Sequence, residues 1–145
     1  DIGIVGSDII MEEQRRCHEV LDLGFGKCTM CVAGPPEAED LLKHHEMIRV
    51  ASKYPNIARD YFYNRKHQTV DIIKLNGSIE IAPILDLSDV IVDIVETGTT
   101  LKENNLSPFE TIVPISARLI SNKASFSFKA EKIDLIKKEL LKQVN

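Results

Sequence analysis

Three threonines and two carboxylates surround one glycine in VIVDIVETGTTLKENN, residues 90–105. The apolar run 90–95, interrupted only by Asp93, predicts a buried strand, and the polar segment 101–105 can begin a helix. Gly98 allows close approach to the backbone, and hydroxyl donors surround it at Thr97, Thr99 and Thr100. A strand, a glycine turn and a helix start in this order are typical of an anion site.

The charges around this turn decide which anion it suits. The turn contains no Lys or Arg, which excludes the Walker pattern. Asp93 and Glu96 flank it instead, and a carboxylate repels a phosphate unless it faces a hydroxyl or a metal ion. The turn therefore favours a sugar phosphate over a bare phosphate. The alternative is an ordinary strand-to-helix connection with a threonine N-cap, because short glycine motifs are common.

Composition narrows the class of protein. The chain has 145 residues, of which 43% are hydrophobic and 28% charged, and these values indicate a soluble globular protein. A net charge of −4 argues against a nucleic-acid partner. No apolar run reaches the roughly 20 residues that span a bilayer, and no signal peptide precedes the first strand. Three cysteines, an odd number, favour reduced thiols and a cytoplasmic location. The abrupt start in strand-like sequence without Met favours a fragment.

Two further stretches have the order strand, glycine, helix. DIGIVG, residues 1–6, precedes a helix expected at 9–14, which Ser7 and Asp8 can cap. A strand at 69–75 turns through Asn76-Gly77-Ser78 into a helix expected at 79–87. The order β-α-β-α over residues 69–105 predicts a parallel sheet, and such sheets bind ligands at the carboxyl ends of their strands. We therefore expect Gly77, Ser78 and Asp8 to contribute to substrate binding.

The remaining pattern predicts an α/β protein with two lobes. Further strands are expected at 19–23, 27–33, 49–52 and 116–120, a helix at 57–65 capped by Asn56, and an amphipathic closing helix from Ile133. Gly34-Pro35-Pro36 breaks the chain, and Pro114 interrupts a later apolar segment. The first lobe is expected at 1–33 and 113–145, and the second at 34–112. Two crossings between lobes predict a hinge and a cleft.

A CxxC pair, Cys28 and Cys31, raises the question of a metal site. Residues three apart on a strand point to opposite faces, so the two thiols diverge. We expect no structural metal here.

Four blocks, in order along the chain, resemble the ATP phosphoribosyltransferase family of histidine biosynthesis. They are DIGIVGSDII, RVASKYPNIARDYF, KLNGSIEIAP and VDIVETGTTLKENNL. The resemblance implies a two-lobed, type II periplasmic-binding-protein-like fold with mixed, largely parallel sheets. It further implies transfer of 5-phosphoribose from phosphoribosyl pyrophosphate to N1 of ATP, with Mg²⁺ and release of pyrophosphate. By similarity Glu96 through Thr100 hold the 5′-phosphate, and Asp93 and Glu96, the expected catalytic residues, reach the ribose hydroxyls.

The resemblance also implies an assembly. The family's N-terminal segment with a Lys-Gly-Arg motif is not matched, so the first lobe is expected to be incomplete and the chain inactive alone. The match fits the short form of the family, which forms oligomers with a regulatory subunit resembling histidyl-tRNA synthetase.

Two other functions remain open. A solute-binding module can share the same fold, and fold alone does not decide between them. A type I phosphoribosyltransferase carries adjacent acidic residues before its loop, whereas Asp93 and Glu96 are three positions apart.

Overall fold

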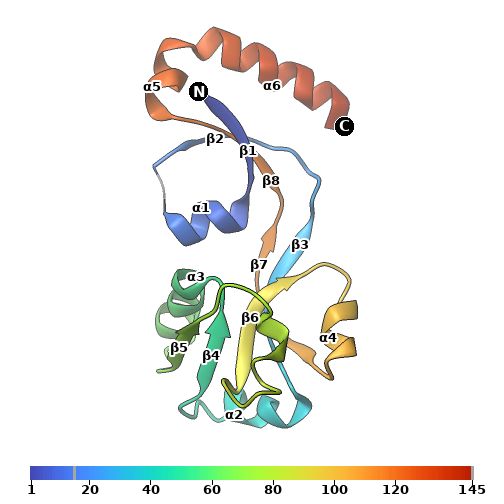
Figure 1. The fold of residues 1–145 in the computed structure, drawn as a ribbon. Coiled ribbons are helices and arrows are strands. Elements are labelled where there is room, and N and C mark those ends of the chain that lie inside the picture. Colours follow the sequence, from blue (N-terminus) through green and yellow to red (C-terminus); the bar gives the residue numbers. More distant parts are fainter. Residues whose placement is uncertain (15, 145) are drawn as a thin grey trace. The chain divides into compact units, whose positions relative to one another are not determined.

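The computed structural model describes residues 1–14 and 16–144, which form two compact units. One unit comprises Asp1–Lys27 with Ile115–Asn145, and the other comprises Cys28–Pro114 (Figure 1). Arg15 and Asn145, which the expected first lobe includes, lie outside the described residues. Both units combine helices with a sheet, so the expected α/β class is confirmed.

The first unit is built on a three-stranded sheet in the order β1-β8-β2. Its strands are β1 (Ile2–Gly6), β2 (His18–Asp22) and β8 (Ala117–Ser121). β8 pairs with both neighbours in antiparallel register. The described pairing in this unit is therefore antiparallel, and the parallel strands lie in the second unit.

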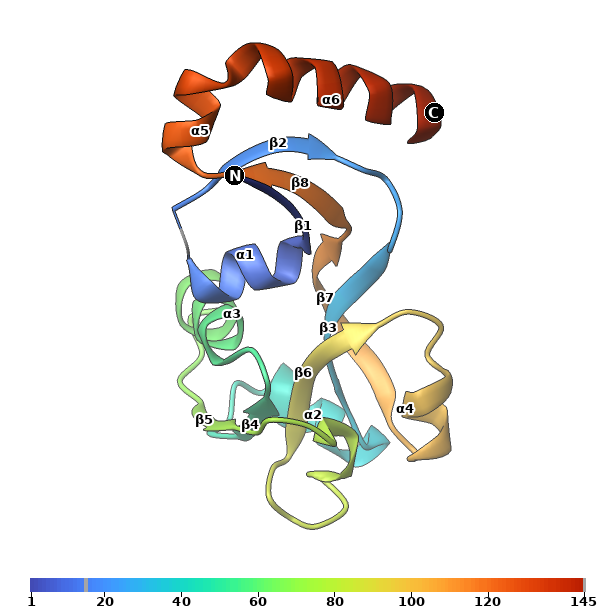
Figure 2. The same cartoon turned by 45° about the horizontal axis from the view of Figure 1, so that its top comes forward.

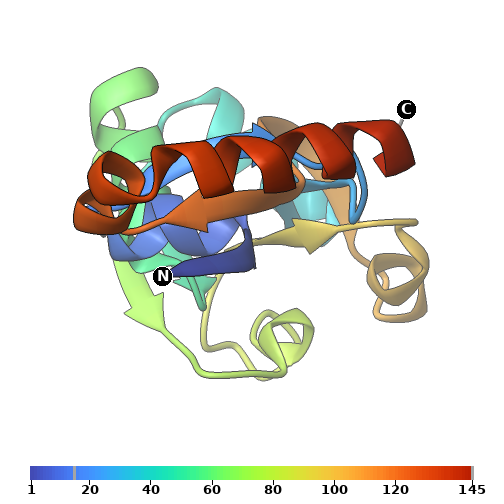
Figure 3. The ribbon, with the colours of Figure 1, turned by 90° about the horizontal axis from the view of Figure 1, so that it is seen from above.

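Three helices accompany this sheet. They are α1 (Ser7–Glu13), α5 (Lys123–Phe128) and α6 (Ala130–Val144). The sequence predicts no helix between the strand expected at 116–120 and the closing helix, but α5 lies there. Its N-cap is Asn122, whose Oδ1 accepts a hydrogen bond from Ser125 N at 2.6 Å. α6 runs along β8 in both rotated views (Figures 2 and 3). Ile133 of α6 is buried, whereas Ile136, one turn further along the same face, is 38% exposed, so the apolar face of α6 is only partly covered.

The second unit carries a five-stranded sheet in the order β5-β4-β6-β3-β7. Its strands are β3 (Cys28–Gly34), β4 (Arg49–Ser52), β5 (Asp71–Lys74), β6 (Val90–Val95) and β7 (Ser107–Ile115). β4 runs parallel to both β5 and β6, while β3 runs antiparallel to β6. The expected parallel arrangement over residues 69–105 is confirmed, and the sheet as a whole is mixed.

The boundary between the units differs from the expected one. Residues Thr29 to Ala33 of β3 pair with β6, from Thr29↔Val95 to Ala33↔Ile91. These ladder bonds tie β3 to the second unit, so the first boundary follows Lys27 rather than lying at Gly34. The chain returns after Pro114, close to the expected position.

Two expected helices of the second unit are shorter or differently built. The segment 57–65 divides into α3 (Pro55–Arg59) and a π-helical turn, η2 (Asp60–Arg65). Asn56 is not the cap, because Pro55 takes the first helical position and Tyr54 precedes it. The helix expected at 79–87 is only a 3₁₀ turn, η3 (Ile79–Ile81), since Pro83 lacks the N–H that a helix interior needs.

An ionic clamp holds the segment that replaces this helix. Arg49, the first residue of β4, contacts Asp86 through Nη2 at 2.8 Å and Asp89 through Nη2 at 3.1 Å. Its backbone N–H also donates to Asp89 Oδ2 at 2.8 Å. The segment between η3 and β6 is thereby fixed to the amino end of β4.

One face of the sheet in the second unit carries a buried apolar cluster. Ala33, Ala51 and Ile91 from three adjacent strands pack with residues of η3, α4 (Thr99–Glu103) and their flanks: Ile79, Ala82, Leu101 and Leu106. Val95 packs against the same cluster. Because side chains alternate along a strand, Asp93 points to this face as well. None of the described helices is both long enough and apolar enough to cross a lipid bilayer.

Candidate active site

The end of β6 and the loop that follows it line a cavity of about 310 Å³ in the second unit. The lining residues are Glu80, Leu101 and the continuous run Asp93, Ile94, Val95, Glu96, Thr97, Gly98, Thr99 and Thr100. The structure therefore brings together the predicted residues Asp93, Glu96, Thr97, Gly98, Thr99 and Thr100.

Gly98 has the backbone conformation that the turn requires. Its φ is +83°, in the left-handed region that favours glycine, and an added Cβ would meet no atom within 4 Å. The space beside its Cα is thus open. A side chain at this position would be strained by its backbone angles and would occupy that space.

The threonine hydroxyls form a local network around this glycine. The Oγ1 atoms of Thr97 and Thr99 lie 3.0 Å apart, and the backbone N–H of Thr99 points to Thr97 Oγ1 at 3.4 Å. Both side chains are exposed to solvent. α4 spans only five residues, so its dipole adds little, and the groups available to donate to an anion are these hydroxyls and the adjacent backbone N–H groups.

Asp93 is the most enclosed carboxylate of the cavity. Burial raises the pKa of its carboxyl above the ordinary value, and the negative charge of the nearby Glu80 raises this pKa further. A hydrogen bond from Ile94 N at 2.9 Å and the positive charge of Lys53 both lower it. A carboxylate held in this way accepts hydrogen bonds strongly, because few water molecules compete for its oxygens. Asp93 is thus suited to bind ligand hydroxyls.

Glu80 is a site residue that sequence reasoning missed. It belongs to η3, which follows β5 rather than β6, and it is partly buried beside Asp93. Its position depends on how η3 folds over the sheet face, and no local pattern encodes that contact. The one sequence feature that could have pointed to Glu80 is its place inside the block KLNGSIEIAP, which resembles the family.

Three predicted residues do not line this cavity. Gly77 and Ser78 are exposed in the turn after β5, where Ser78 adopts a left-handed φ of 52°. Asp8 is buried in the first turn of α1, in the other unit. Their roles in substrate binding remain predictions.

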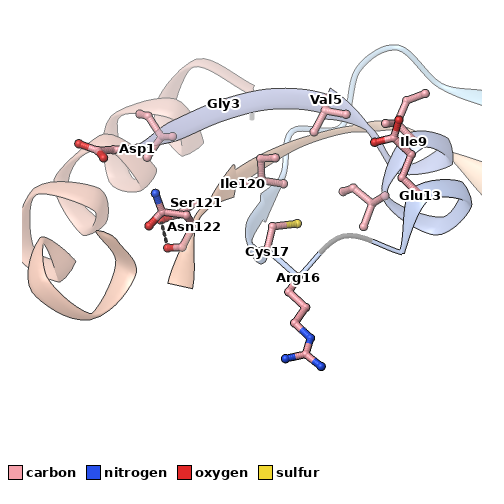
Figure 4. A pocket seen from close by; sticks show the side chains of 12 residues that line it. Asp1, Gly3, Val5, Ile9, Glu13, Arg16, Cys17, Ile120, Ser121 and Asn122 are labelled. Atoms are coloured by element: carbon pink, nitrogen blue, oxygen red, sulfur yellow. Dashed lines mark hydrogen bonds between the residues drawn. The ribbon is translucent and has the colours of Figure 1, made fainter. Parts of the chain in front are cut away.

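The first unit has a cavity of its own, of about 360 Å³ and mainly apolar (Figure 4). Ile9, Ile10, Cys17 and Ile120 contribute to its lining. Arg16, Ser121 and Asn122 also border this cavity, together with the carboxylates of Asp1 and Glu13. Among the described residues, no group of three or more His, Cys, Asp or Glu is arranged to hold a metal ion.

Comparison with known proteins identifies the family of this chain. The family model described as "HisG: ATP phosphoribosyltransferase" matches residues 1–142. An ATP phosphoribosyltransferase of Lachnoclostridium phytofermentans is 65% identical over 133 residues, which cover 92% of this chain and 62% of that protein. One of Lachnospira eligens is 58% identical over 144 residues, covering 99% and 67%. The chain thus spans about three-fifths to two-thirds of the length of these relatives.

Solved structures agree on the fold. The ATP phosphoribosyl transferase (HisG:HisZ) complex from Thermotoga maritima matches with a TM-score of 0.84 and 36% identity, over 99% of this chain and 70% of that one. Tv2483 bound to L-arginine matches with a TM-score of 0.61 and 15% identity, covering 94% and 65%, a likeness of fold alone. The expected type II periplasmic-binding-protein-like fold is confirmed.

Proposed function

Because this chain belongs to the ATP phosphoribosyltransferase family, we propose that its protein transfers 5-phosphoribose from phosphoribosyl pyrophosphate to N1 of ATP. Pyrophosphate is the second product, and the reaction is the first step of histidine biosynthesis. We assign this activity to the whole protein rather than to this chain alone, because the chain covers 62% of the length of its relative from Lachnoclostridium phytofermentans.

One observation carries the proposal: a single cavity combines donors for a phosphate with acceptors for sugar hydroxyls. The donors are the hydroxyls of Thr97, Thr99 and Thr100 and the backbone beside Gly98. The acceptors are the carboxylates of Asp93, Glu80 and Glu96. A phosphate alone would be repelled by the acids, whereas a ribose 5-phosphate uses both kinds of group.

This arrangement suits substitution at the anomeric carbon of ribose. The bond from C1 to the pyrophosphate oxygen breaks, and its electron pair leaves with pyrophosphate. Positive charge develops on C1 and the ring oxygen, and the lone pair of ATP N1 forms the new bond. Asp93 and Glu96 hold the ribose and place negative charge near it, so catalysis rests on positioning and electrostatics.

Magnesium enters this scheme with the donor. The described residues form no three-ligand group for a resident ion. Mg²⁺ commonly binds one or two carboxylates together with substrate phosphates. We therefore propose that it arrives bound to phosphoribosyl pyrophosphate as part of the substrate.

We also propose a regulatory partner and an oligomeric assembly. The related Thermotoga maritima protein was solved as a HisG:HisZ complex. We expect a partner of that kind, resembling histidyl-tRNA synthetase, to bind the protein to which this chain belongs.

The test is pyrophosphate release by the complete protein, with and without such a partner subunit. We expect release that requires both ATP and phosphoribosyl pyrophosphate and that yields one phosphoribosyl-ATP for each pyrophosphate. A solute-binding module would bind one of these ligands and release no pyrophosphate. That result, obtained with the partner present, would reject the proposed activity.

A further inference from the structure

The cavity at the end of β6 is acidic, although its proposed ligand is an anion. Glu80, Asp93 and Glu96 line it, and the described lining residues include no Lys, Arg or His. Like charges a few ångströms apart repel, most strongly where the solvent is excluded. Besides the Mg²⁺ proposed to arrive with it, a donor that carries a phosphate and a pyrophosphate is therefore stabilised by a cation of the protein close to this cavity.

Lys53 lies at the place where such a cation could act. It directly follows β4, which is the neighbour of β6. The printed register pairs Ala51 with Ile91 and Ser52 with Val92, so Lys53 comes level with Asp93. Ala51 and Ile91 share one apolar cluster, and two residues further along come Lys53, directly after the end of β4, and Asp93 on β6.

An electrostatic observation agrees with this placement. The charge of Lys53 acts on Asp93 and opposes the rise of its pKa that burial causes. Lys53 itself is exposed, and the ion pairs of the described residues do not include it. Other cations of the unit are engaged: Arg49 with Asp86 and Asp89, and Lys66 with Glu110.

The arrangement of elements indicates which part of the donor Lys53 meets. α4 and the threonine loop lie on the β7 side of β6, whereas β4 lies on the other side (Figures 1 and 2). If the loop holds the 5′-phosphate and Asp93 the ribose hydroxyls, the group on C1 extends past Asp93 toward β4. That group is the pyrophosphate.

We propose that Lys53 is a substrate-binding cation of this site and that its ammonium group binds the pyrophosphate of the donor. The proposal rests on the proposed function. It adds a specific contact just after β4, on the side of β6 away from the loop, that would stabilise the leaving group as its negative charge grows.

The test compares three ligands on the complete protein by calorimetry: phosphoribosyl pyrophosphate, inorganic pyrophosphate and ribose 5-phosphate. Lys53→Met should weaken the first two by roughly tenfold or more, the usual size of a hydrogen bond to a charged group, and change ribose 5-phosphate less than about twofold. Lys53→Arg should restore most of the affinity, because it keeps the charge.

Lys74→Met is the matched control. Lys74 ends β5, is also exposed, and pairs in register with Ser52, which places it on the opposite face of the sheet. It should bind all three ligands as the unaltered protein does.

Each other outcome overturns the proposal. Equal losses for ribose 5-phosphate and pyrophosphate would show a general field effect, and unchanged affinities in Lys53→Met would show no contact, with the proposed function intact in both cases. An unaltered protein that fails to bind phosphoribosyl pyrophosphate would reject the proposed function together with this inference. Lys53→Arg behaving like Lys53→Met while both remain folded would also count against a charge contact.

Discussion

Replacing Thr99 by Val should weaken the binding of ribose 5-phosphate while leaving the loop in shape. Valine keeps the branched side chain and removes only the hydroxyl. In the free protein that hydroxyl lies 3.0 Å from the hydroxyl of Thr97, in an exposed position. The ligand therefore replaces an existing weak hydrogen bond by a stronger one to a charged group.

The expected magnitude follows from this exchange. A hydrogen bond to a charged group contributes about 1.5–3 kcal/mol, and a neutral exposed one about 0.5–1 kcal/mol. The difference is about 1–2 kcal/mol, which corresponds to a dissociation constant roughly 5–30 times higher. The backbone N–H groups beside Gly98 remain in place, so binding should be reduced rather than abolished.

Calorimetric titration of the complete protein with ribose 5-phosphate measures this effect, and Thr99→Ser is the control. Serine keeps the hydroxyl and should bind within about twofold of the unaltered protein. If Thr99→Val binds equally well, or if Thr99→Ser loses as much as Thr99→Val, the hydroxyl does not contact the phosphate and the magnitude above has no basis.

Two further predictions concern stability, both followed by urea denaturation. Asp93→Asn should raise the free energy of unfolding at pH 7, because burial raises the pKa of the folded-state carboxyl and so disfavours its ionised form in the folded protein. This gain in stability should shrink as the pH falls toward 3.8, the ordinary pKa of an aspartate. A gain that grows in acid would contradict this sign. Ser52→Ala should lower the free energy of unfolding by about 2–4 kcal/mol. The buried Oγ of Ser52 donates to Val92 O at 2.7 Å and accepts from Tyr54 N at 2.8 Å, so alanine would leave both backbone groups without this partner. Ser88→Ala is the comparison, since its buried hydroxyl has no hydrogen-bond partner among the described residues, and it should cost nothing; equal costs for both serines would refute the argument.

The parts of the fold that sequence predicted well are those with a strong local signal. The observed β6 has its predicted ends, because a short run rich in β-branched residues has few other solutions. The observed β4 also has its predicted ends, although it contains a single β-branched residue. The loop residues from Asp93 to Thr100 are contiguous, so finding the strand and its glycine found most of the cavity.

The misses have physical causes in long-range structure. The expected helix at 79–87 ignored Pro83, and the segment is instead held by Arg49 from a distant strand. α5 has no helical periodicity, and its N-cap alone marks its start. Glu80 lines the cavity only because η3 lies over the sheet, and Lys53 comes level with Asp93 only because β4 pairs with β6.

We propose that the cavity of the β6 loop binds a sugar phosphate through both its donors and its acids. Glu96→Gln separates these contributions, because the substitution keeps the size of the side chain and removes its charge. The complete protein is titrated with phosphoribosyl pyrophosphate and, separately, with inorganic phosphate. We expect the affinity for phosphoribosyl pyrophosphate to fall roughly tenfold, as for the loss of a hydrogen bond to a charged group, and the affinity for inorganic phosphate to stay unchanged. Unchanged affinity for phosphoribosyl pyrophosphate in Glu96→Gln, together with the same result for Thr99→Val, would place the site on another part of the chain.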